Sequence, residues 1–379
     1  MQPTDLRTHN IAAILRLLSF AEEPLSRAGI AAKTGLTKPT VSKLVDELLV
    51  GGLVNEGIPT RQGRSGRPIT PISIAPSTLA GVGLSISADH ISLRIRGLSG
   101  ATLYESTDPS PATTPEDAAA RCAQLLTPAL AALPTGCRIA GITVSVPGRP
   151  DITARHLISA PNLNWEDVNL ADLIESALNN PSLPDIRLVN DARIITHTEL
   201  LYRREESFLL IYGETGIGGS IVIDGAILPG TNGWAGEIGH TIVSPNGPTC
   251  RCGKQGCLEA YTSAWAMRDT AHLDTSIPIN ELPNHIPDDM ADSVGTWLGI
   301  ALANMITALD LPTVVFAGYF ADLFDRIEPT VRSTISSHAL DIEHRTINLH
   351  PLHLRENATL VGASLDALSP VFDDPTPWI

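Results

Sequence analysis

The stretch CRCGKQGCLEA, residues 250–260, holds three of the five cysteines of this 379-residue chain. A disulfide framework distributes cysteines along a small secreted domain, whereas this chain is long and poor in cysteine. The spacing C-x-C-x4-C is instead typical of thiolates that bind one tetrahedral metal ion, for which zinc is the usual choice. Three thiolates leave one corner of the tetrahedron open, so a fourth ligand must come from another part of the chain.

We predict that the fourth ligand comes from the upstream stretch GWAGEIGHTIV, residues 233–243. Its histidine and the three thiolates would complete a closed Cys3His site that holds one structural zinc ion per chain. Gly253 and Gly256 would permit the tight turns between the ligands. The alternative is a group of reduced cysteines that happen to lie close together. The predicted ligands are His240, Cys250, Cys252 and Cys257.

Length and composition predict a globular protein of two or three domains. Hydrophobic residues make up 43% of the chain, but no apolar run reaches the roughly 20 residues that a membrane span needs. The first residues, MQPTDLRTHN, lack the basic and apolar regions of a signal peptide. Isolated Cys122 and Cys137 are expected to be reduced core residues. We therefore expect a cytoplasmic protein with no membrane partner.

The formal charge of −15 is distributed unevenly along the chain. Residues 1–70 contain nine Lys/Arg and six Asp/Glu, a balance of +3, so the remaining residues carry −18. A basic head on an acidic body predicts that a polyanion binds the head alone. Because +3 is a small excess, the arrangement of the basic residues has to support this prediction.

Three helices are predicted within the first 50 residues. HNIAAILRLLSF (9–20) carries apolar residues at i, i+3, i+4 and i+7, the spacing of an amphipathic helix. A short helix follows in SRAGIAAKTG (26–35), with Ser26 as its N-cap and Gly35 at its end. A third helix begins after the N-cap Thr37 and buries one apolar face. That face consists of Val41, Leu44, Val45 and Leu48.

The second and third helices, joined by the tight turn TGLT, are typical of a helix-turn-helix unit. The second helix of such a unit enters the major groove of DNA with its N-terminal residues on the bases. We therefore predict that residues 1–72 bind a double-stranded DNA operator. The alternative is a three-helix packing module with a solvated basic loop. The side chains expected to face DNA are Lys38, Thr40, Ser42 and Lys43.

A glycine-rich basic stretch, RQGRSGRP (61–68), follows the third helix. Arginines on a slim glycine loop can reach phosphates or enter a narrow minor groove. We interpret this stretch as the tip of a β-wing that presents Arg61, Arg64 and Arg67, so the head is predicted to be a winged helix-turn-helix. Residues 73–79 are expected to link it to the body.

From about residue 80 onward, strand-like runs alternate with helical ones, which is typical of an α/β body. A hairpin is predicted in AGVGLSISADHISLRIRG, a helix in TPEDAAARCAQLLTPALAAL and a buried strand in RIAGITVSVPG. DIRLVNDAR and SFLLIYGETGIGGSIVIDGAIL repeat the pattern of a strand followed by a turn. The turn GETGIGGS (213–220) could bring backbone N–H groups to an anion, although hairpin turns use the same glycines.

These motifs together resemble the ROK family of sugar kinases and sugar-responsive transcription factors. The resemblance covers roughly residues 78–370 and includes SVPG (145–148), PNLNW (161–165), VNDA (189–192) and VGASL (361–365) in the expected order. The positions that fit the family signature, GEIGH followed by C-x-C-G-x-x-G-C-x-E, are Glu237, His240, Cys250, Cys252, Gly253, Gly256, Cys257 and Glu259.

The resemblance implies an actin-like, ribonuclease H-like body at residues 80–379, with a sugar between two α/β lobes. We expect one lobe at about 80–190 plus the C-terminal segment, and the other at 191–360. The N-terminal winged helix is similar to that of the regulator branch, which implies a homodimer or a dimer of dimers. The family's sugar-binding positions fall on Asn162, Asn190, Asp191, Glu237, His240 and Glu259.

Carboxylates and amides suit these positions because sugar hydroxyls both donate and accept hydrogen bonds. The zinc would lock the loop so that Glu237 and Glu259 converge on the ligand. Alternatively, Asn190 and Asp191 merely cap the start of a helix. If Asp191 binds as a carboxylate, Asp191→Asn should weaken effector binding roughly ten- to hundredfold, because it replaces an acceptor with a donor.

The kinases of the family bind ATP through a first phosphate loop that reads approximately D-x-G-G-T. The corresponding stretch here places Gly83 at the acidic position and Ser85 and Ile86 at the two glycines. This change removes a carboxylate expected to help hold magnesium and puts a side chain where backbone must approach phosphate. Gly318 is followed by bulky Tyr319, where the kinases prefer a further glycine.

We therefore expect a sugar-sensing regulator, more readily a repressor than an activator, and no enzyme. Asp191 is retained at the position of the kinases' catalytic base. Two alternatives remain open at this point: an ATP-dependent sugar kinase with a DNA-binding head, and a regulator of the same build that responds to a non-sugar effector.

Overall fold

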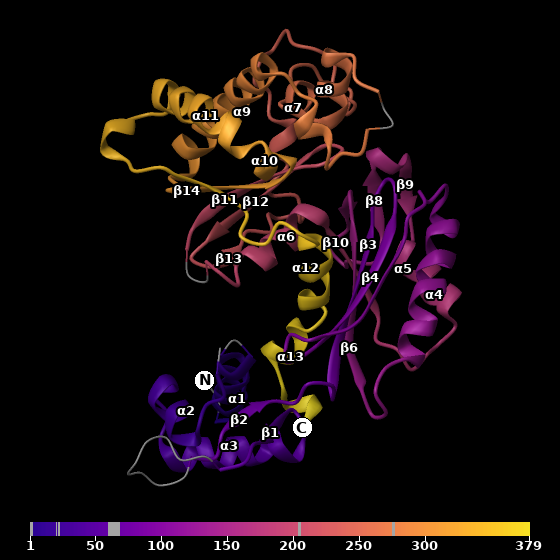
Figure 1. Ribbon diagram of the computed structural model, residues 1–379, viewed down its shortest axis with the longest axis vertical. Coiled ribbons are helices and arrows are strands. Elements are labelled where there is room, and N and C mark those ends of the chain that lie inside the picture. The colour runs from indigo at the N-terminus through magenta and orange to yellow at the C-terminus, as the bar shows by residue number, and fades with distance from the viewer. Residues whose placement is uncertain (1–2, 20, 22, 60–68, 204–205, 275–276) are drawn as a thin grey trace.

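The computed structural model describes residues 3–19, 21, 23–59, 69–203, 206–274 and 277–379. Figure 1 shows a helical head at the N-terminus and two α/β lobes, with the C-terminus close to the head. Within the described ranges, no helix combines the length and apolarity that crossing a membrane requires.

The head contains the three helices expected from the sequence. Ser26 caps the second helix by accepting a hydrogen bond from the Gly29 N–H at 3.0 Å, and Gly35 ends that helix with a φ of 73°. Thr37 caps the third helix by accepting from the Thr40 N–H at 3.3 Å. The predicted apolar face of the third helix is buried. The helices are α1 (Pro3–Ser19), α2 (Arg27–Thr34) and α3 (Lys38–Val50).

Two short strands, β1 (Val54–Glu56) and β2 (Ile72–Ile74), pair in antiparallel fashion after α3. The predicted wing tip, with Arg61, Arg64 and Arg67, lies outside the described residues. Strand β3 begins at Leu79, so only residues 75–78 separate β2 from the first strand of the body.

The first lobe is built on a five-stranded sheet of order β10-β6-β3-β4-β5. β3, β4 and β5 are antiparallel neighbours, whereas β6 and β10 continue the sheet in parallel. Helices α4 (Pro115–Ala131) and α5 (Leu170–Leu178) pack their apolar residues on one face. The strands are β3 (Leu79–Ile86), β4 (Ile91–Gly97), β5 (Thr102–Asp108), β6 (Arg138–Val146) and β10 (Ile186–Asn190).

The second lobe repeats this topology with the order β13-β12-β11-β14-β15. β11 and β12 form the antiparallel hairpin around the glycine-rich turn, and β14 and β15 are parallel to β11. Helices α9 (Asp288–Leu309) and α11 (Phe324–His338) cover one face, and α6 (Asp191–Glu199) contributes to the core on the other. The strands are β11 (Phe208–Gly213), β12 (Ile217–Ile223), β13 (Ala226–Ile227), β14 (Thr313–Gly318) and β15 (Asn348–Pro351).

Helix α12 (Ala358–Asp366) connects the lobes, because it packs on β3 of the first and on α6 of the second. It approaches β3 so closely that a Cβ atom on Gly83 would lie 2.5 Å from the backbone nitrogen of Ser364. Position 83 therefore has no room for a side chain.

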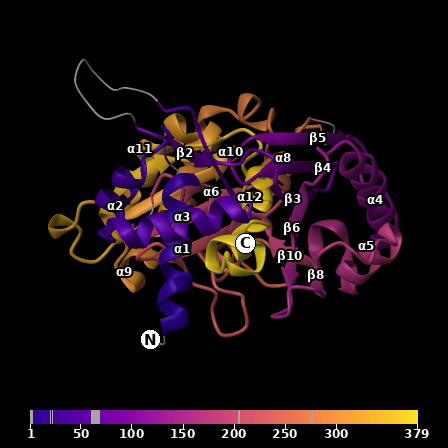
Figure 2. The same ribbon diagram turned by 90° about the horizontal axis from the view of Figure 1, so that it is seen from below.

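The C-terminal segment joins the body to the head. Helix α13 (Ser369–Asp373) packs against α1, where Asp373 forms an ion pair with Arg16 at 2.8 Å. Leu368 and Val371 belong to the same buried cluster as the head's apolar residues. Figure 2 shows the C-terminus beside α1 and α3.

Several short elements position the site between the lobes. A three-stranded sheet extends the first lobe, and short helices surround the cysteine-rich loop of the second. They are β7 (Arg149–Pro150), β8 (Leu157–Ala160), β9 (Trp165–Val168), the 3-10 helices Pro161–Leu163 and Ile238–His240, α7 (Glu259–Thr262), α8 (Ala264–Ala271) and α10 (Tyr319–Asp322).

Candidate metal centre and ligand cavity

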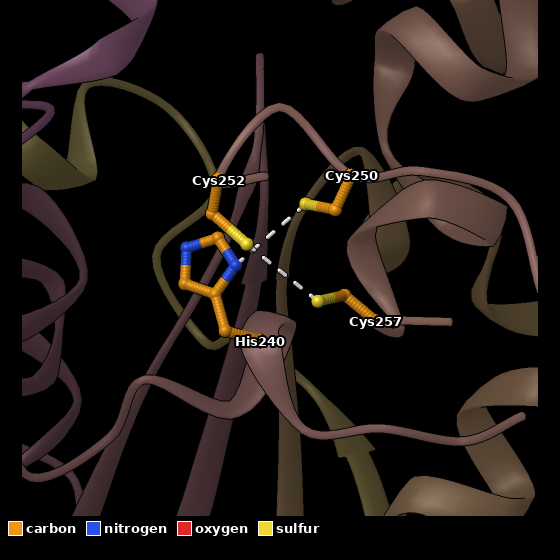
Figure 3. A group of neighbouring side chains, drawn as sticks. All are labelled: His240, Cys250, Cys252 and Cys257. Atoms are coloured by element: carbon orange, nitrogen blue, oxygen red, sulfur yellow. Dashed lines mark hydrogen bonds between the residues drawn. The ribbon is translucent and has the colours of Figure 1, made fainter. Parts of the chain in front are cut away.

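The four predicted metal ligands converge on one point in the second lobe (Figure 3). His240 ends a 3-10 helix, Cys250 and Cys252 lie in the loop after it, and Cys257 lies two residues before α7. One ligand atom from each side chain lies within 4.8 Å of all the others. The sequence prediction that these residues come together is therefore confirmed, while the identity of a bound metal stays a prediction.

The cluster has the dimensions of a tetrahedral zinc site. The Cys252 and Cys257 sulfurs are 3.7 Å apart, and His240 Nδ1 lies 3.8 Å from Cys250 Sγ. Zn–S bonds of about 2.3 Å at tetrahedral angles place two sulfurs about 3.8 Å apart. Burial raises the pKa of the Cys250 and Cys257 thiols, so a cation at the centre would have to hold them as thiolates. The donor set fits zinc.

The backbone of the cysteine-rich loop turns at the two predicted glycines. Gly253 and Gly256 have φ values of 83° and 76°, in the left-handed region. A Cβ atom on Gly256 would also lie 1.6 Å from the carbonyl oxygen of Ser244. No other residue fits at position 256, so the loop geometry depends on this glycine.

Glu259 connects the metal cluster to the glycine-rich turn. Its Oε1 lies 3.5 Å from Cys250 Sγ, and its Oε2 accepts a hydrogen bond from the Ile217 N–H at 2.9 Å. A Cβ atom on Gly216 would lie 2.5 Å from Glu259 Oε2, so only glycine allows this approach. The turn thus directs one backbone N–H, that of Ile217, to the protein's own Glu259 side chain.

A cavity of about 960 Å³ lies between the lobes beside the metal cluster. All six residues that the family resemblance assigns to sugar binding line it. The first lobe and the start of α6 contribute three of them, and the second lobe contributes the others. They are Asn162, Asn190, Asp191, Glu237, His240 and Glu259.

Asn190 is both a wall of the cavity and the N-cap of α6. Its Oδ1 accepts from the Arg193 N–H at 3.3 Å, and its Nδ2 donates to the Gly148 carbonyl at 3.0 Å. The capping role considered from the sequence is therefore real for Asn190. It fixes the first turn of α6 and with it the position of Asp191.

Glu237 and His240 face the cavity together. His240 Nε2 lies 3.9 Å from Glu237 Oε2, while Nδ1 points to the thiols. Nδ1 of His240 is thus directed to the metal cluster, and Nε2 is directed to the Glu237 carboxyl group. Burial raises the pKa of Glu237, and the neighbouring His240 and Arg149 oppose that rise.

The lining residues that were not predicted from the sequence include Arg149, Tyr212 and Glu214. The Arg149 guanidinium of the first lobe lies 5.2 Å from the centre of the Trp234 ring of the second. Tyr212 Oη donates to Glu214 Oε2 at 3.0 Å. Of these residues, only Glu214 could have been expected at the site from the sequence, because it is an acidic residue in the glycine-rich turn that was predicted to approach an anion.

A second cavity, of about 440 Å³, adjoins the first at Tyr212 and Glu214. Gly213 and Gly318 line it, and the Tyr319 ring packs against Gly213 so closely that a Cβ atom there would lie 2.6 Å from it. The Tyr319 hydroxyl donates to the Thr262 carbonyl at 2.7 Å, which holds the ring in place.

The predicted DNA-reading side chains lie at the start of α3. Lys38 and Lys43 are exposed, and Thr40 and Ser42 are half-buried. The Thr40 hydroxyl is 2.8 Å from that of Thr37. Two acidic groups that follow on α3 are paired within the head, Asp46 with Arg27 and Glu47 with Arg7. The basic side chains at the helix start therefore face solvent without an ion pair in the described residues.

Most of the body matches one known protein family. Residues 81–369 match the model described as the ROK family, and residues 9–56 match the IclR helix-turn-helix domain. The xylose repressor of Bacillus spizizenii is 26% identical over 363 residues, covering 90% of this chain and 90% of that protein.

Solved structures share the fold. A ROK family transcriptional regulator, a homologue of the E. coli MLC protein, has a TM-score of 0.79 at 22% identity and covers 97% of both chains. A ROK family glucokinase from Streptomyces griseus, in complex with glucose and AMPPNP, has a TM-score of 0.63 at 23% identity. It covers 76% of this chain and 99% of the kinase. The body thus has the two-lobed architecture of sugar kinases, behind a helix-turn-helix domain.

Proposed function

The chain belongs to the ROK family, and on that premise we propose that it is a DNA-binding transcriptional repressor whose body senses a sugar. The observation that carries the proposal is one cavity lined by the full set of sugar-binding positions, in a chain that also has a helix-turn-helix domain. The xylose repressor that aligns over 90% of the chain makes D-xylose the first candidate effector.

Three features support sensing without phosphoryl transfer. Gly83 has no space for a carboxylate that could hold magnesium, because α12 packs directly on it. Ile86, the last residue of β3, stands where the kinases carry a glycine and is buried in the core of the first lobe. Glu214 places a carboxylate in the glycine-rich turn, where it would repel a phosphate. We therefore propose that the chain is not a kinase.

In this proposal a structural zinc ion, one per chain, is held by His240, Cys250, Cys252 and Cys257. When bound, the metal supplies a rigid crosslink between the 3-10 helix and the cysteine-rich loop. The protein's own side chains would contact the effector. Glu237, from the start of the cross-linked segment, and Glu259, from its end, face the cavity together with Asn162 and the start of α6.

Regulation follows from linkage between the lobes and the head. A sugar that binds the closed arrangement of the lobes better than the open one shifts the population by its differential affinity. We propose that the chain acts as a homodimer or a dimer of dimers, with residues 1–72 as the winged DNA-binding domain and Arg61, Arg64 and Arg67 on its wing. Closure would change the spacing of two heads relative to DNA half-sites. We propose that the chain is cytoplasmic, because a repressor has to reach the DNA that it regulates.

The proposal is tested by selecting a binding sequence from randomised double-stranded DNA with the full chain and measuring affinity by fluorescence anisotropy. Lys38→Ala and Lys43→Ala should each weaken binding roughly tenfold, as expected for a lost base contact of about 1–3 kcal/mol. Wild-type affinity should fall linearly with salt on a log–log plot. Lys254→Ala, an exposed lysine of the body, is the matched control and should bind as wild type does. Equal effects of all three substitutions would contradict the assignment.

A further inference from the structure

One arginine in the wall of the larger cavity has no partner of its own. Arg193, in the first turn of α6, is half-buried and lines the cavity. Its guanidinium forms neither a hydrogen bond nor an ion pair with any residue that the structure describes. Other half-buried arginines of the body are paired, since Arg155 lies 2.6 Å from Asp172 and Arg203 lies 2.7 Å from Glu199. A partly buried charge without a partner is costly, so this guanidinium is suited to an anion from outside the chain.

The charged groups that face Arg193 do not neutralise it. Asp366, the last residue of α12, lies 3.3 Å from Arg187 of β10, so these two charges cancel each other. Asp366 also accepts from the Thr143 hydroxyl at 2.8 Å, and His197 Nε2 lies 3.8 Å from it. Burial lowers the pKa of Arg193 and that of His197. The positive charge of Arg193 is therefore left without a counterion of its own.

A second arginine, Arg149, lines the same cavity from the first lobe. Its Nε and Nη2 donate to the Ser159 hydroxyl at 3.1 and 2.8 Å, and its guanidinium carbon lies 5.2 Å from the centre of the Trp234 ring. These contacts orient the guanidinium without supplying a negative charge, and no ion pair joins it to a described carboxylate. Arg149 is thus held ready for an anionic acceptor.

The side chain of Asn190 joins the two segments that carry these arginines. Its Nδ2 donates to the carbonyl of Gly148, the residue before Arg149, and its Oδ1 accepts from the Arg193 N–H. Asn190 itself lines the cavity and directly precedes Asp191, so both arginines lie near the predicted sugar-binding positions. A phosphate group has three acceptor oxygens and can therefore accept from two guanidinium groups at once.

We propose that Arg149 and Arg193 form an anion subsite in the larger cavity, so that the preferred effector is a sugar carrying a phosphate or a carboxylate group. This inference rests on the proposed function, in which the sugar ring occupies the six predicted positions. The cavity, about 960 Å³, is at the upper end of the range for drug-sized ligands and has room for a substituent beyond one ring. D-Xylose, which is neutral, would bind and leave the subsite empty.

Four sugars with the same pyranose ring test the subsite. D-Xylose lacks the C6 group of D-glucose, while D-glucose 6-phosphate and D-glucuronate carry a phosphate and a carboxylate there. In isothermal titration calorimetry, at least one of the anionic sugars should bind wild type about tenfold or more tightly than D-glucose does. The tighter of the two identifies the group that the subsite takes. Binding of both anionic sugars no tighter than that of D-glucose would overturn the inference.

Variants place the preference at the two arginines. Arg149→Met and Arg193→Met should each remove most of it, because methionine supplies neither the charge nor the donors. Either variant serves alone, should the other fail to fold. Arg355→Met is the matched control, since Arg355 lines the smaller cavity and already lies 3.9 Å from Asp322. It should keep the preference. A preference that survives in both Arg149→Met and Arg193→Met would contradict the proposal.

A carboxylate on the same wall provides the opposite change. Glu166 is exposed, lines the cavity and is the cross-strand neighbour of Ser159. Glu166→Gln removes a negative charge near Arg149, so the anionic sugars should bind as tightly as to wild type or more tightly. Weaker binding of the anionic sugars to this variant would mean that the subsite does not lie at this wall.

Inorganic phosphate separates failure of the subsite from failure of the sugar. If none of the four sugars binds, the choice of ring is wrong, and the subsite is measured without a ring. Phosphate, compared with chloride at equal ionic strength, should raise the melting temperature of wild type more than that of the Arg149→Met/Arg193→Met double variant. General effects of phosphate on stability act on both proteins alike. Equal increments in the two proteins would overturn the subsite.

Discussion

The two cavities of the body differ in what their walls can bind. The larger one, about 960 Å³, is lined by every sugar-binding position that the sequence indicates, and the metal cluster stands at its side. The smaller one, about 440 Å³, has the Tyr319 ring packed against Gly213 and a carboxylate where the two cavities meet. Under the proposed function, the larger cavity holds a sugar while the smaller one does not hold a triphosphate. Sugar recognition and phosphoryl transfer would then be separable properties of this architecture.

Loss of the metal should disturb the larger cavity most. Cys252→Ser removes one ligand, and the binding free energy of structural zinc is largely folding free energy. We expect the melting temperature to fall by about 10 °C or more, with a zinc content far below one ion per chain. Differential scanning fluorimetry and metal analysis on the same sample measure both quantities.

Cys137→Ser is the control for this experiment, since Cys137 is a free cysteine outside the cluster. It should keep both the metal and the melting temperature close to those of wild type. A Cys252→Ser protein as stable as wild type would mean that the cluster does not hold the wall of the larger cavity.

The packing of β3 against α12 predicts an intermediate effect. Gly83→Ala adds one methyl group at a position 2.5 Å from the Ser364 backbone nitrogen, which should cost about 1–3 kcal/mol of unfolding free energy. Gly29→Ala is the control, because its Cβ would lie 3.4 Å from the Ser26 hydroxyl and meet no backbone. Denaturant titration compares them. Equal stability of the two variants would show that position 83 is free to hold a side chain.

The smallest effect is expected where the lobes meet across the larger cavity. Replacing the Arg149 guanidinium or the Trp234 ring removes a cation–π contact of about 0.5–1 kcal/mol at a partly exposed site. Affinity for D-xylose should change less than about fivefold. In a double-mutant cycle with Arg149→Met and Trp234→Leu, the coupling should lie in this range. A coupling of zero would show that the contact between Arg149 and Trp234 does not contribute to closure of the lobes.

The sequence was sufficient for features whose parts lie close together along the chain. The four metal ligands fall between residues 240 and 257, and their chemistry admits few other interpretations. The caps Ser26, Gly35 and Thr37 follow from local backbone needs and lie where they were predicted. The alternation of strands and helices was enough for the α/β class, and the family resemblance supplied the two lobes.

Contacts between segments that are far apart along the chain could not be predicted from the sequence. The hydrogen bond from the Ile217 N–H to Glu259 depends on how the β11–β12 turn meets the start of α7, 42 residues further along the chain. Gly83 was recognised as a departure from the kinase loop, but its packing cause lies in α12, near the other end of the chain. The Arg149–Trp234 contact needs both lobes in place.

The central claim is that the sugar controls DNA binding without being phosphorylated. The most direct measurement titrates D-xylose into the protein on its selected DNA sequence in the presence of magnesium and ATP. Operator occupancy is followed by anisotropy and ADP by a coupled assay in the same sample. The account predicts that the sugar changes occupancy equally with and without ATP, and that no ADP forms above the protein-free rate. Formation of ADP in step with xylose phosphate would contradict it and identify a kinase.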